Sequence, residues 1–170
     1  AAQTQAVTED GALLSGKMVA TDVDKGDTQT FNTQNPPAGF TLNVDGSYSF
    51  DPSHAAYQHL AAGQTQDLTI PVTVTDSAGA TSTQNLVITV AGTNDGPAIA
   101  STHAGAKLIH EDATTDSISG DLRGYDPDTS DTLTWALVGN GHGAYGQLSF
   151  DAQTQHWTYH LDNADADTNA

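Results

Sequence analysis

Two short acidic motifs have the residue types and spacing of a metal site. Each is an Asp-x-Asp step with a third Asp three residues later, Asp22, Asp24 and Asp27 in the first and Asp126, Asp128 and Asp131 in the second. In an extended segment, residues two apart face the same side, so each step presents two carboxylates together. Calcium takes about six to eight oxygen ligands from carboxylates, carbonyls and water. The spacing therefore predicts calcium binding, but not in an EF-hand, because the loop with its central Gly and terminal Glu is missing.

A purely structural role is the alternative for either motif taken alone. Asp residues in loops often accept hydrogen bonds from nearby backbone N–H groups and stabilise turns in this way. Two motifs in register, with Asn94 and Asp95 between them, favour metal binding over this alternative. Asp45 and Asp76 lie at turns of predicted hairpins and are interpreted as turn residues.

The overall charge agrees with a cationic ligand. The chain has 170 residues, and its 21 Asp and Glu against 4 Lys and Arg give a formal net charge of −17. Such a charge disfavours nucleic acid and anionic membrane surfaces and draws divalent cations to carboxylate clusters. Cysteine is absent from the sequence, so disulfides and thiolate metal sites are excluded.

The sequence contains no recognisable membrane-spanning segment and no recognisable secretory signal. No apolar run approaches the roughly 20 residues of a membrane span, so we expect no direct membrane insertion. The N-terminus, AAQTQAVTED, lacks the basic start and apolar core of a secretory signal. We interpret the sequence as a piece of a longer protein.

Motifs typical of enzymes are not supported by their context. Gly141, Gly143 and Gly146 spell G-x-G-x-x-G, but a dinucleotide site needs a helix next, and the following QLSF reads as a strand. The seven histidines include His156 and His160 on one predicted strand face, without an evident third zinc ligand. No nucleophile elbow is present. We predict that the chain is not an enzyme.

The segments that must position the acids read as short β-strands. Residues 41–51 alternate apolar and polar side chains around Asp45-Gly46, a pair that favours a tight hairpin turn. Residues 68–90 form a second hairpin, and residues 13–23 and 28–33 are weaker strand candidates. Gly16 is interpreted as a bulge, and residues 54–62 alone could hold a helical turn. About seven short strands predict an antiparallel β-sandwich.

An internal repeat divides the chain into two modules. The equivalent residues are Glu9-Asp10 with Glu111-Asp112, Phe31 with Trp135, Leu42 with Leu148, Tyr48 with Trp157, and Phe50 with Tyr159. The polar stretch AGTNDGP lies between the copies. We predict a first domain at residues 1–93, a linker at 94–97 and a second domain at 98–170.

The second copy is incomplete by the same comparison. It contains no counterpart of the hairpin at residues 68–90, so we expect it to lack its last two strands. Missing strands leave backbone groups unpaired and a core half open. The second module is therefore predicted to be marginally stable alone or to borrow an edge from another chain.

Most aromatic residues are predicted to fill the core, because they alternate with polar neighbours along the strands. Tyr57, Tyr125 and Tyr145 instead fall in turn-like segments. They are the candidates for a sugar-binding surface.

The order of these motifs resembles the VCBS repeat, a cadherin-like module arrayed in tandem in giant bacterial surface adhesins. The resemblance rests on TEDG, SGKMVATDVDKGD, LNVDGSYSF and GTNDGP in the first copy and on EDATTDSISG, YDPDTSDTLTW and HWTYHLDNADAD in the second. It implies tandem Ig-like or cadherin-like antiparallel β-sandwich modules, the second incomplete. It also implies type I secretion as in RTX adhesins, display at the bacterial cell surface and calcium-dependent rigidity.

A cadherin-like topology would bring the acids of consecutive modules together. In such a module the turn after the first strand lies near the exit linker, and the loop after the second strand lies at the opposite end. The resemblance thus implies an interdomain Ca²⁺ site formed by Glu9, Asp10, Asn94, Asp95, Asp126, Asp128 and Asp131. It also implies a weaker N-terminal site formed by Asp22, Asp24 and Asp27.

The expected function is a calcium-stiffened structural extender of a secreted bacterial surface adhesin, acting in cell adhesion and biofilm formation. Its partners would be the neighbouring repeats of the same chain. The alternative is a module on the same fold that binds a carbohydrate or a host surface protein. A third possibility is an accessory module of a secreted hydrolase.

Overall fold

The computed structural model describes residues 3–24, 26–101, 108–110 and 115–164, in which every regular element is a β-strand. Contacts divide the chain into a first unit, residues 1–95 with 127–130, and a second unit, residues 96–126 with 131–170. The all-β class is confirmed, whereas the limits 1–93, 94–97 and 98–170 stay predictions. The described residues hold no helix that is long and apolar enough to cross a membrane.

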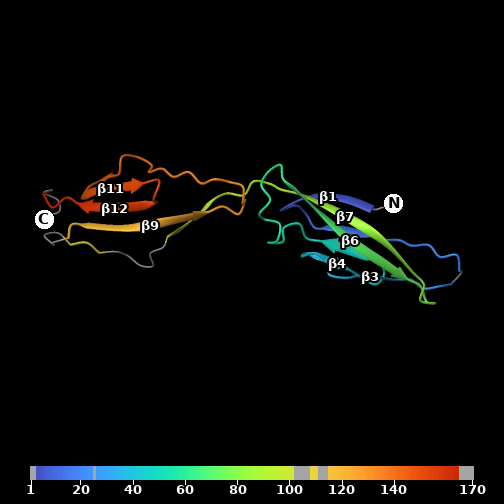
Figure 1. The fold of residues 1–170 in the computed structure, drawn as a ribbon. Coiled ribbons are helices and arrows are strands. Elements are labelled where there is room, and N and C mark those ends of the chain that lie inside the picture. The colour runs from blue at the N-terminus through green and yellow to red at the C-terminus, as the bar shows by residue number, and fades with distance from the viewer. Residues whose placement is uncertain (1–2, 25, 102–107, 111–114, 165–170) are drawn as a thin grey trace. The chain divides into compact units, whose positions relative to one another are not determined.

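The first unit is a sandwich of two sheets, with the orders β1-β7-β6-β3 and β2-β5-β4 (Figure 1). Its strands are β1 (Gln3–Thr8), β2 (Leu14–Lys17), β3 (Thr30–Thr33), β4 (Phe40–Leu42), β5 (Ser47–Phe50), β6 (Thr65–Thr75) and β7 (Thr81–Ala91). β6 and β7 pair along all 11 residues of each strand. Within the described chain β1 pairs with β7 alone and β3 with β6 alone, so the β6–β7 hairpin holds the larger sheet together.

One pairing differs from the predicted antiparallel arrangement. β1 lies parallel to β7, with Gln3 opposite Leu86 and Thr8 opposite Ala91. Parallel neighbours need a long connection, which β2 to β6 supply here. Since both strands end at the same place, the turn after β1 lies beside the segment that follows β7.

The core of the first unit lies between its two sheets. Phe50, Leu86, Ile88 and Val90 have 0% exposure and Ile70 has 1%. These residues come from both sheets and form one apolar cluster. Burial of this alternating apolar surface is the main force that holds the sandwich together.

The two predicted hairpins are confirmed as β4–β5 and β6–β7. Val44 belongs to the alternating apolar pattern of residues 41–51, which predicts that its side chain faces the core. It is 71% exposed, so that prediction is wrong. The reason is that Val44 lies inside the turn, where the N–H of Gly46 donates to the carbonyl of Asn43 at 2.9 Å. Turn residues do not follow the period of two that strand residues follow.

Gly16 is not a bulge. β2 pairs with β5 in continuous register, with Gly16 opposite Tyr48. A Cβ added to Gly16 would collide with the Tyr48 ring, so the glycine makes room for this buried aromatic side chain. Residues 54–62 contain no helix but successive turns, in which Tyr57 N–H donates to His54 O at 3.0 Å and Leu60 N–H to Tyr57 O at 3.1 Å.

The second unit has, in its described residues, one sheet with the order β10-β11-β12-β9-β8 (Figure 1). Its strands are β8 (Ala98–Ser101), β9 (Ser117–Tyr125), β10 (His142–Gly143), β11 (Gly146–Asp151) and β12 (His156–Leu161). The glycine-rich stretch at residues 141–146 leads through β10 into β11, as the strand interpretation predicted. Among the described residues of this unit, Leu161 is the one buried large apolar side chain, with 8% exposure.

The sheet register corrects one equivalence of the internal repeat. Leu42 lies opposite Tyr48 in the first unit, whereas the residue opposite Trp157 in the second unit is Phe150. Leu42 therefore corresponds to Phe150 and not, as predicted, to Leu148. Both 148 and 150 are apolar and share one sheet face, so the alternating pattern alone did not determine the register.

Candidate metal centre

Glu9 is the first residue after β1, and its position follows from the parallel β1–β7 pairing. Its N–H still continues that pairing and donates to Ala91 O at 2.9 Å. The chain then turns, with Gly11 N–H donating to Thr8 O at 3.0 Å and Asp10 at a φ of 57°. Asp is among the residues that tolerate a positive φ. The Glu9 side chain is 1% exposed.

The two carboxylate oxygens of Glu9 have different surroundings. Oε1 accepts hydrogen bonds from the backbone N–H of Thr93 at 2.7 Å and from its hydroxyl at 3.3 Å. Oε2 is buried and has no hydrogen-bond partner among the described residues. A buried carboxylate oxygen without a donor is costly, so Oε2 is suited to ligate a cation.

Asp128 lies in the segment 127–130, which belongs to the first unit. It is 1% exposed, and its Oδ2 accepts a hydrogen bond from Asp95 N–H at 2.8 Å. The neighbouring Thr129 donates its N–H and its hydroxyl to His59 O at 3.4 and 3.3 Å. These contacts hold Asp128 where carboxylate oxygens of Glu9, Asp95 and Asp128 all lie within 4.8 Å of one another.

Three carboxylates this close repel one another. Two unit charges 4 Å apart cost about 4 kcal/mol at the effective dielectric near a protein surface. A bound cation offsets this repulsion, and hard oxygen donors of this kind match Ca²⁺. The donor set of Glu9, Asp95 and Asp128, with the orphaned Oε2, therefore fits the predicted metal.

The other residues of the predicted interdomain site are divided between the two units. Asp10 is exposed, and its Oδ1 accepts a hydrogen bond from Gln58 Nε2 at 2.9 Å. Asn94 is exposed and donates from Nδ2 to Asp95 O at 2.5 Å. Half-buried Asp126 and exposed Asp131 belong to the second unit. Their roles as ligands stay predictions, and the repeated pair Glu111-Asp112 lies outside the described residues.

The N-terminal group has a different membership from the predicted one. Carboxylate oxygens of Asp22, Asp27 and Asp76 lie within 4.8 Å of one another. Asp24 is not in this group, and its N–H donates to Asp22 Oδ1 at 2.9 Å. Asp22 is exposed, so water can solvate its carboxylate, and a cation is less strongly favoured in this group than at the buried Glu9.

Sequence reasoning missed Asp76 as a possible ligand. Its Oδ1 accepts hydrogen bonds from Ala78 N–H at 2.9 Å and Ala80 N–H at 2.8 Å, so the predicted turn role is confirmed. The β3–β6 pairing places Thr75 opposite Thr30 and thereby brings Asp76 near the loop before β3. A correct strand pairing is the signal that would have found it.

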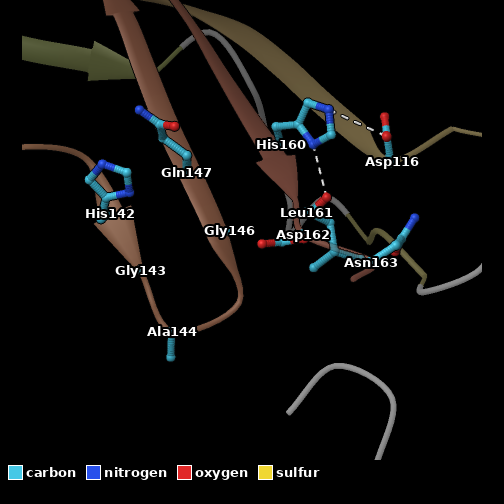
Figure 2. A pocket seen from close by; sticks show the side chains of 10 residues that line it. All are labelled: Asp116, His142, Gly143, Ala144, Gly146, Gln147, His160, Leu161, Asp162 and Asn163. Atoms are coloured by element: carbon cyan, nitrogen blue, oxygen red, sulfur yellow. Dashed lines mark hydrogen bonds and ion pairs between the residues drawn. The ribbon is translucent and has the colours of Figure 1, made fainter. Parts of the chain in front are cut away.

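A pocket of about 670 Å³ in the second unit contains two histidines. The distance from His160 Nε2 to Asp116 Oδ2 is 3.3 Å, and the distance from His160 Nδ1 to Leu161 O is 2.8 Å (Figure 2). Figure 2 shows His142 apart from His160. Within the described residues, neither histidine belongs to a group of three ligand atoms within 4.8 Å. The pocket therefore offers no zinc site in that part of the chain.

The three tyrosines considered for a sugar-binding surface differ in their exposure to solvent. Tyr57 is 3% exposed and donates its hydroxyl to Ala38 O at 2.7 Å, so the prediction of an exposed ring is wrong. Burial raises the pKa of the Tyr57 hydroxyl. Tyr125 and Tyr145 are 60% and 51% exposed. The turns at residues 54–60 bury Tyr57 and Leu60, which the turn-like residue pattern of this segment did not reveal.

Comparison with solved structures relates the chain to extracellular cadherin domains. The EC1–4 fragment of the protocadherin PcdhgB3 has 17% identity and a TM-score of 0.51, covering 96% of this chain and 41% of that one. Protocadherin gamma B7 domains 1–4 have 19% identity and a TM-score of 0.48, with coverages of 94% and 40%. Drosophila N-cadherin EC1–4 has 18% identity and a TM-score of 0.43, with coverages of 95% and 39%. The chain thus spans about two fifths of these structures.

Comparison of the sequence itself gives the family. No curated protein matches the chain. The sequence profile of the bacterial cadherin-like domain matches residues 1–92, which are most of the first unit. The two-sheet sandwich of that unit and the likeness to PcdhgB3 agree with this match. The chain therefore belongs to the bacterial cadherin-like domain family.

Proposed function

We propose that this chain is a calcium-stiffened extender of the VCBS type in a secreted bacterial surface adhesin. One observation carries the proposal: Glu9 is 1% exposed, and its Oε2 is buried without a donor beside the carboxylates of Asp95 and Asp128. Family membership supports the structural role, since the matched domain is cadherin-like.

Each of the three acids comes from a different part of the chain. Glu9 follows β1, Asp95 follows β7, and Asp128 lies in the segment after β9. When calcium is bound, it supplies the positive charge that offsets their repulsion. Ligands from three segments then restrict the polar stretch at residues 92–95, which on its own composition would be flexible. In a tandem array of modules, this restriction of each linker would make the whole array stiffer.

The affinity expected for such a site suits export. Extracellular calcium modules bind with dissociation constants of about 10⁻⁴ to 10⁻³ M. A site of this strength stays empty in a cytosol with little free calcium and fills outside the cell. Neighbouring repeats of the same protein are the proposed partners, and cell adhesion and biofilm formation are the proposed setting.

Small-angle X-ray scattering tests the function on the intact chain. Excess Ca²⁺ is expected to narrow the range of conformations relative to a chelator, and Glu9→Gln is expected to abolish this difference. Asp10→Asn is the matched control, because Asp10 is next to Glu9 in the sequence but its carboxylate is exposed and accepts a hydrogen bond from Gln58. Superimposable profiles with calcium and with chelator would show that calcium does not stiffen the chain. Calcium-dependent binding on a glycan array would instead support the carbohydrate-binding alternative.

A further inference from the structure

The sheet of the second unit has one apolar face that is incompletely covered. Ile118 and Leu148 lie opposite Tyr159 on either side of β12, and Phe150 lies opposite Trp157. Residues directly opposite one another in a sheet point to the same side. The second-unit apolar face is formed by Ile118, Leu122, Leu148, Phe150, Trp157 and Tyr159, all of which are half-buried.

The first unit shows what covers the equivalent face. Tyr48 and Phe50, the counterparts of Trp157 and Tyr159, are 3% and 0% exposed. They belong to one cluster with the inward side chains of the β6–β7 hairpin, Ile70, Val72, Leu86, Ile88 and Val90. The three strands β2-β5-β4 match β9-β12-β11 in register, since Gly16 lies opposite Tyr48 and Gly120 opposite Trp157. The same surface is therefore buried in one unit and half-buried in the other.

The segments that would flank such a hairpin in the second unit contain no strand where the structure describes them. The counterpart of Phe31 in β3 is Trp135, and residues 134–137 have no strand. Residues 108–110, which correspond to the end of β1, have none either, and Leu108 is 80% exposed. In the first unit, β1 and β3 pair with β7 and β6. In the described part of the second unit, no strand pairs with residues 108–110 or 134–137.

Two apolar side chains from outside the strands, including Trp135, already pack on this face of the sheet. Its ring lies 6.1 Å from that of Phe150. A Cβ added to Gly124 would meet Trp135 at 2.7 Å and Leu133 at 3.0 Å, so both side chains lie over β9. They cover only part of the face, because the side chains that form it remain half-buried.

We propose that the second-unit apolar face is a docking surface for a β-hairpin with the alternating apolar pattern of β6–β7. Such a hairpin covers the aromatic side chains and also supplies backbone partners for residues 108–110 and 134–137. A second copy packed face to face would cover the side chains but pair neither segment. The hairpin of a second copy is not free to dock, since its Leu86, Ile88 and Val90 are 0% exposed in their own unit.

A fused hairpin tests the proposal. The repeat places Ala170 level with Ala61, so a copy of Ala62–Gly92 is appended directly after Ala170 of the full chain. The two tryptophans of the sequence, Trp135 and Trp157, both lie at this face, so their fluorescence reports on it. We expect emission to shift to shorter wavelength and acrylamide quenching to fall.

Two substitutions in the appended copy alone serve as a matched pair. Ile88→Asp places a charge on the inward side, where the first-unit residue is 0% exposed, and is expected to abolish the emission shift. Thr83→Asp adds the same charge on the exposed side of the hairpin, and the emission shift is expected to remain in this variant. Unchanged emission from the fused chain would overturn the proposal. A dimeric parent chain with shielded tryptophans would also overturn it, because a second copy would then be the occupant.

Discussion

Glu9 Oε1 accepts a 2.7 Å hydrogen bond from the backbone N–H of Thr93, 84 residues further along the chain. The bond ties the turn after β1 to the segment after β7, and it leaves the buried Oε2 beside the carboxylates of Asp95 and Asp128. A rigidly held acid next to two others favours the proposed cation binding, because little side-chain entropy remains to be lost on binding.

Calcium is expected to raise the melting temperature of the first unit. At a tenfold excess over the dissociation constant, binding to the native state alone adds about 1.4 kcal/mol to the free energy of unfolding. For a domain of about 60–100 residues, each kcal/mol raises the melting temperature by about 4–8 °C. Differential scanning calorimetry with calcium and with chelator measures the shift. Mg²⁺ at equal ionic strength is the control, and equal melting temperatures in all three conditions would contradict calcium binding.

Glu9→Gln is expected to change stability in opposite directions with and without calcium. The amide keeps an oxygen that accepts from Thr93 but removes one of three repelling charges, so the variant is expected to be more stable than the wild type in chelator. With calcium it loses a charged ligand, and affinity is expected to fall about tenfold or more, equal to about 1.4 kcal/mol.

Isothermal titration calorimetry and urea unfolding measure these two effects of Glu9→Gln. The control Asp10→Asn is expected to bind calcium like the wild type, since Asn tolerates the φ of 57° at that position. A loss of affinity in Asp10→Asn as large as that in Glu9→Gln would show that Asp10 is also a ligand.

Gly16→Ala is expected to destabilise the first unit by about 1–3 kcal/mol, the cost typical of overpacking a core. The added Cβ would collide with the ring of Tyr48, which is 3% exposed and has little room to move. Urea unfolding followed by circular dichroism measures the loss. Gly96→Ala is the control, because nothing lies within 4 Å of a Cβ at that position. Equal stability of the two variants would show that the ring of Tyr48 can move aside.

Ser47→Ala is expected to raise the pKa of Asp45. Hydrogen bonds from the hydroxyl of Ser47 at 2.6 Å and from its N–H at 3.0 Å, followed by one from Lys17, lower the pKa of this carboxyl from 3.8 to about 2. Because the folded-state pKa is depressed, the stabilisation is present above pH 3.8 and is lost as the pH falls through about 2.

Carbon-13 NMR of the Asp45 carboxyl measures that pKa directly. Lys17→Met serves as the comparison and is expected to raise the pKa by less than Ser47→Ala, since the hydrogen bond from the serine hydroxyl lowers the pKa more than the one from the lysine. A larger change in Lys17→Met would mean that charge, and not the hydroxyl, controls this turn.

The second unit is expected to exchange its amide hydrogens faster than the first. Among its described residues Leu161 is the one buried large apolar side chain, whereas the first unit has a continuous core across two sheets. Low burial lowers the free energy of local opening. Hydrogen exchange read by mass spectrometry compares β6 and β7 with β11 and β12. Equal protection in both units would contradict a marginal second unit.

Local patterns in the sequence were enough to predict the two hairpins of the first unit. Asp45-Gly46 and the alternation on either side of it specify turn and pairing within about ten residues, so no distant contact was needed. The same holds for the all-β class. The acidic motifs also predict a cationic ligand, because carboxylate chemistry is a property of the side chains themselves, and this ligand stays a prediction.

The tertiary structure alone decided which acids meet and which side chains are buried. The parallel β1–β7 pairing joins residues more than 80 positions apart and brings Glu9 to Thr93, a contact that no local pattern encodes. The β3–β6 pairing places Asp76, and not Asp24, with Asp22 and Asp27. Composition and spacing along the chain specify chemistry and local geometry, whereas burial and convergence depend on which distant strands pair.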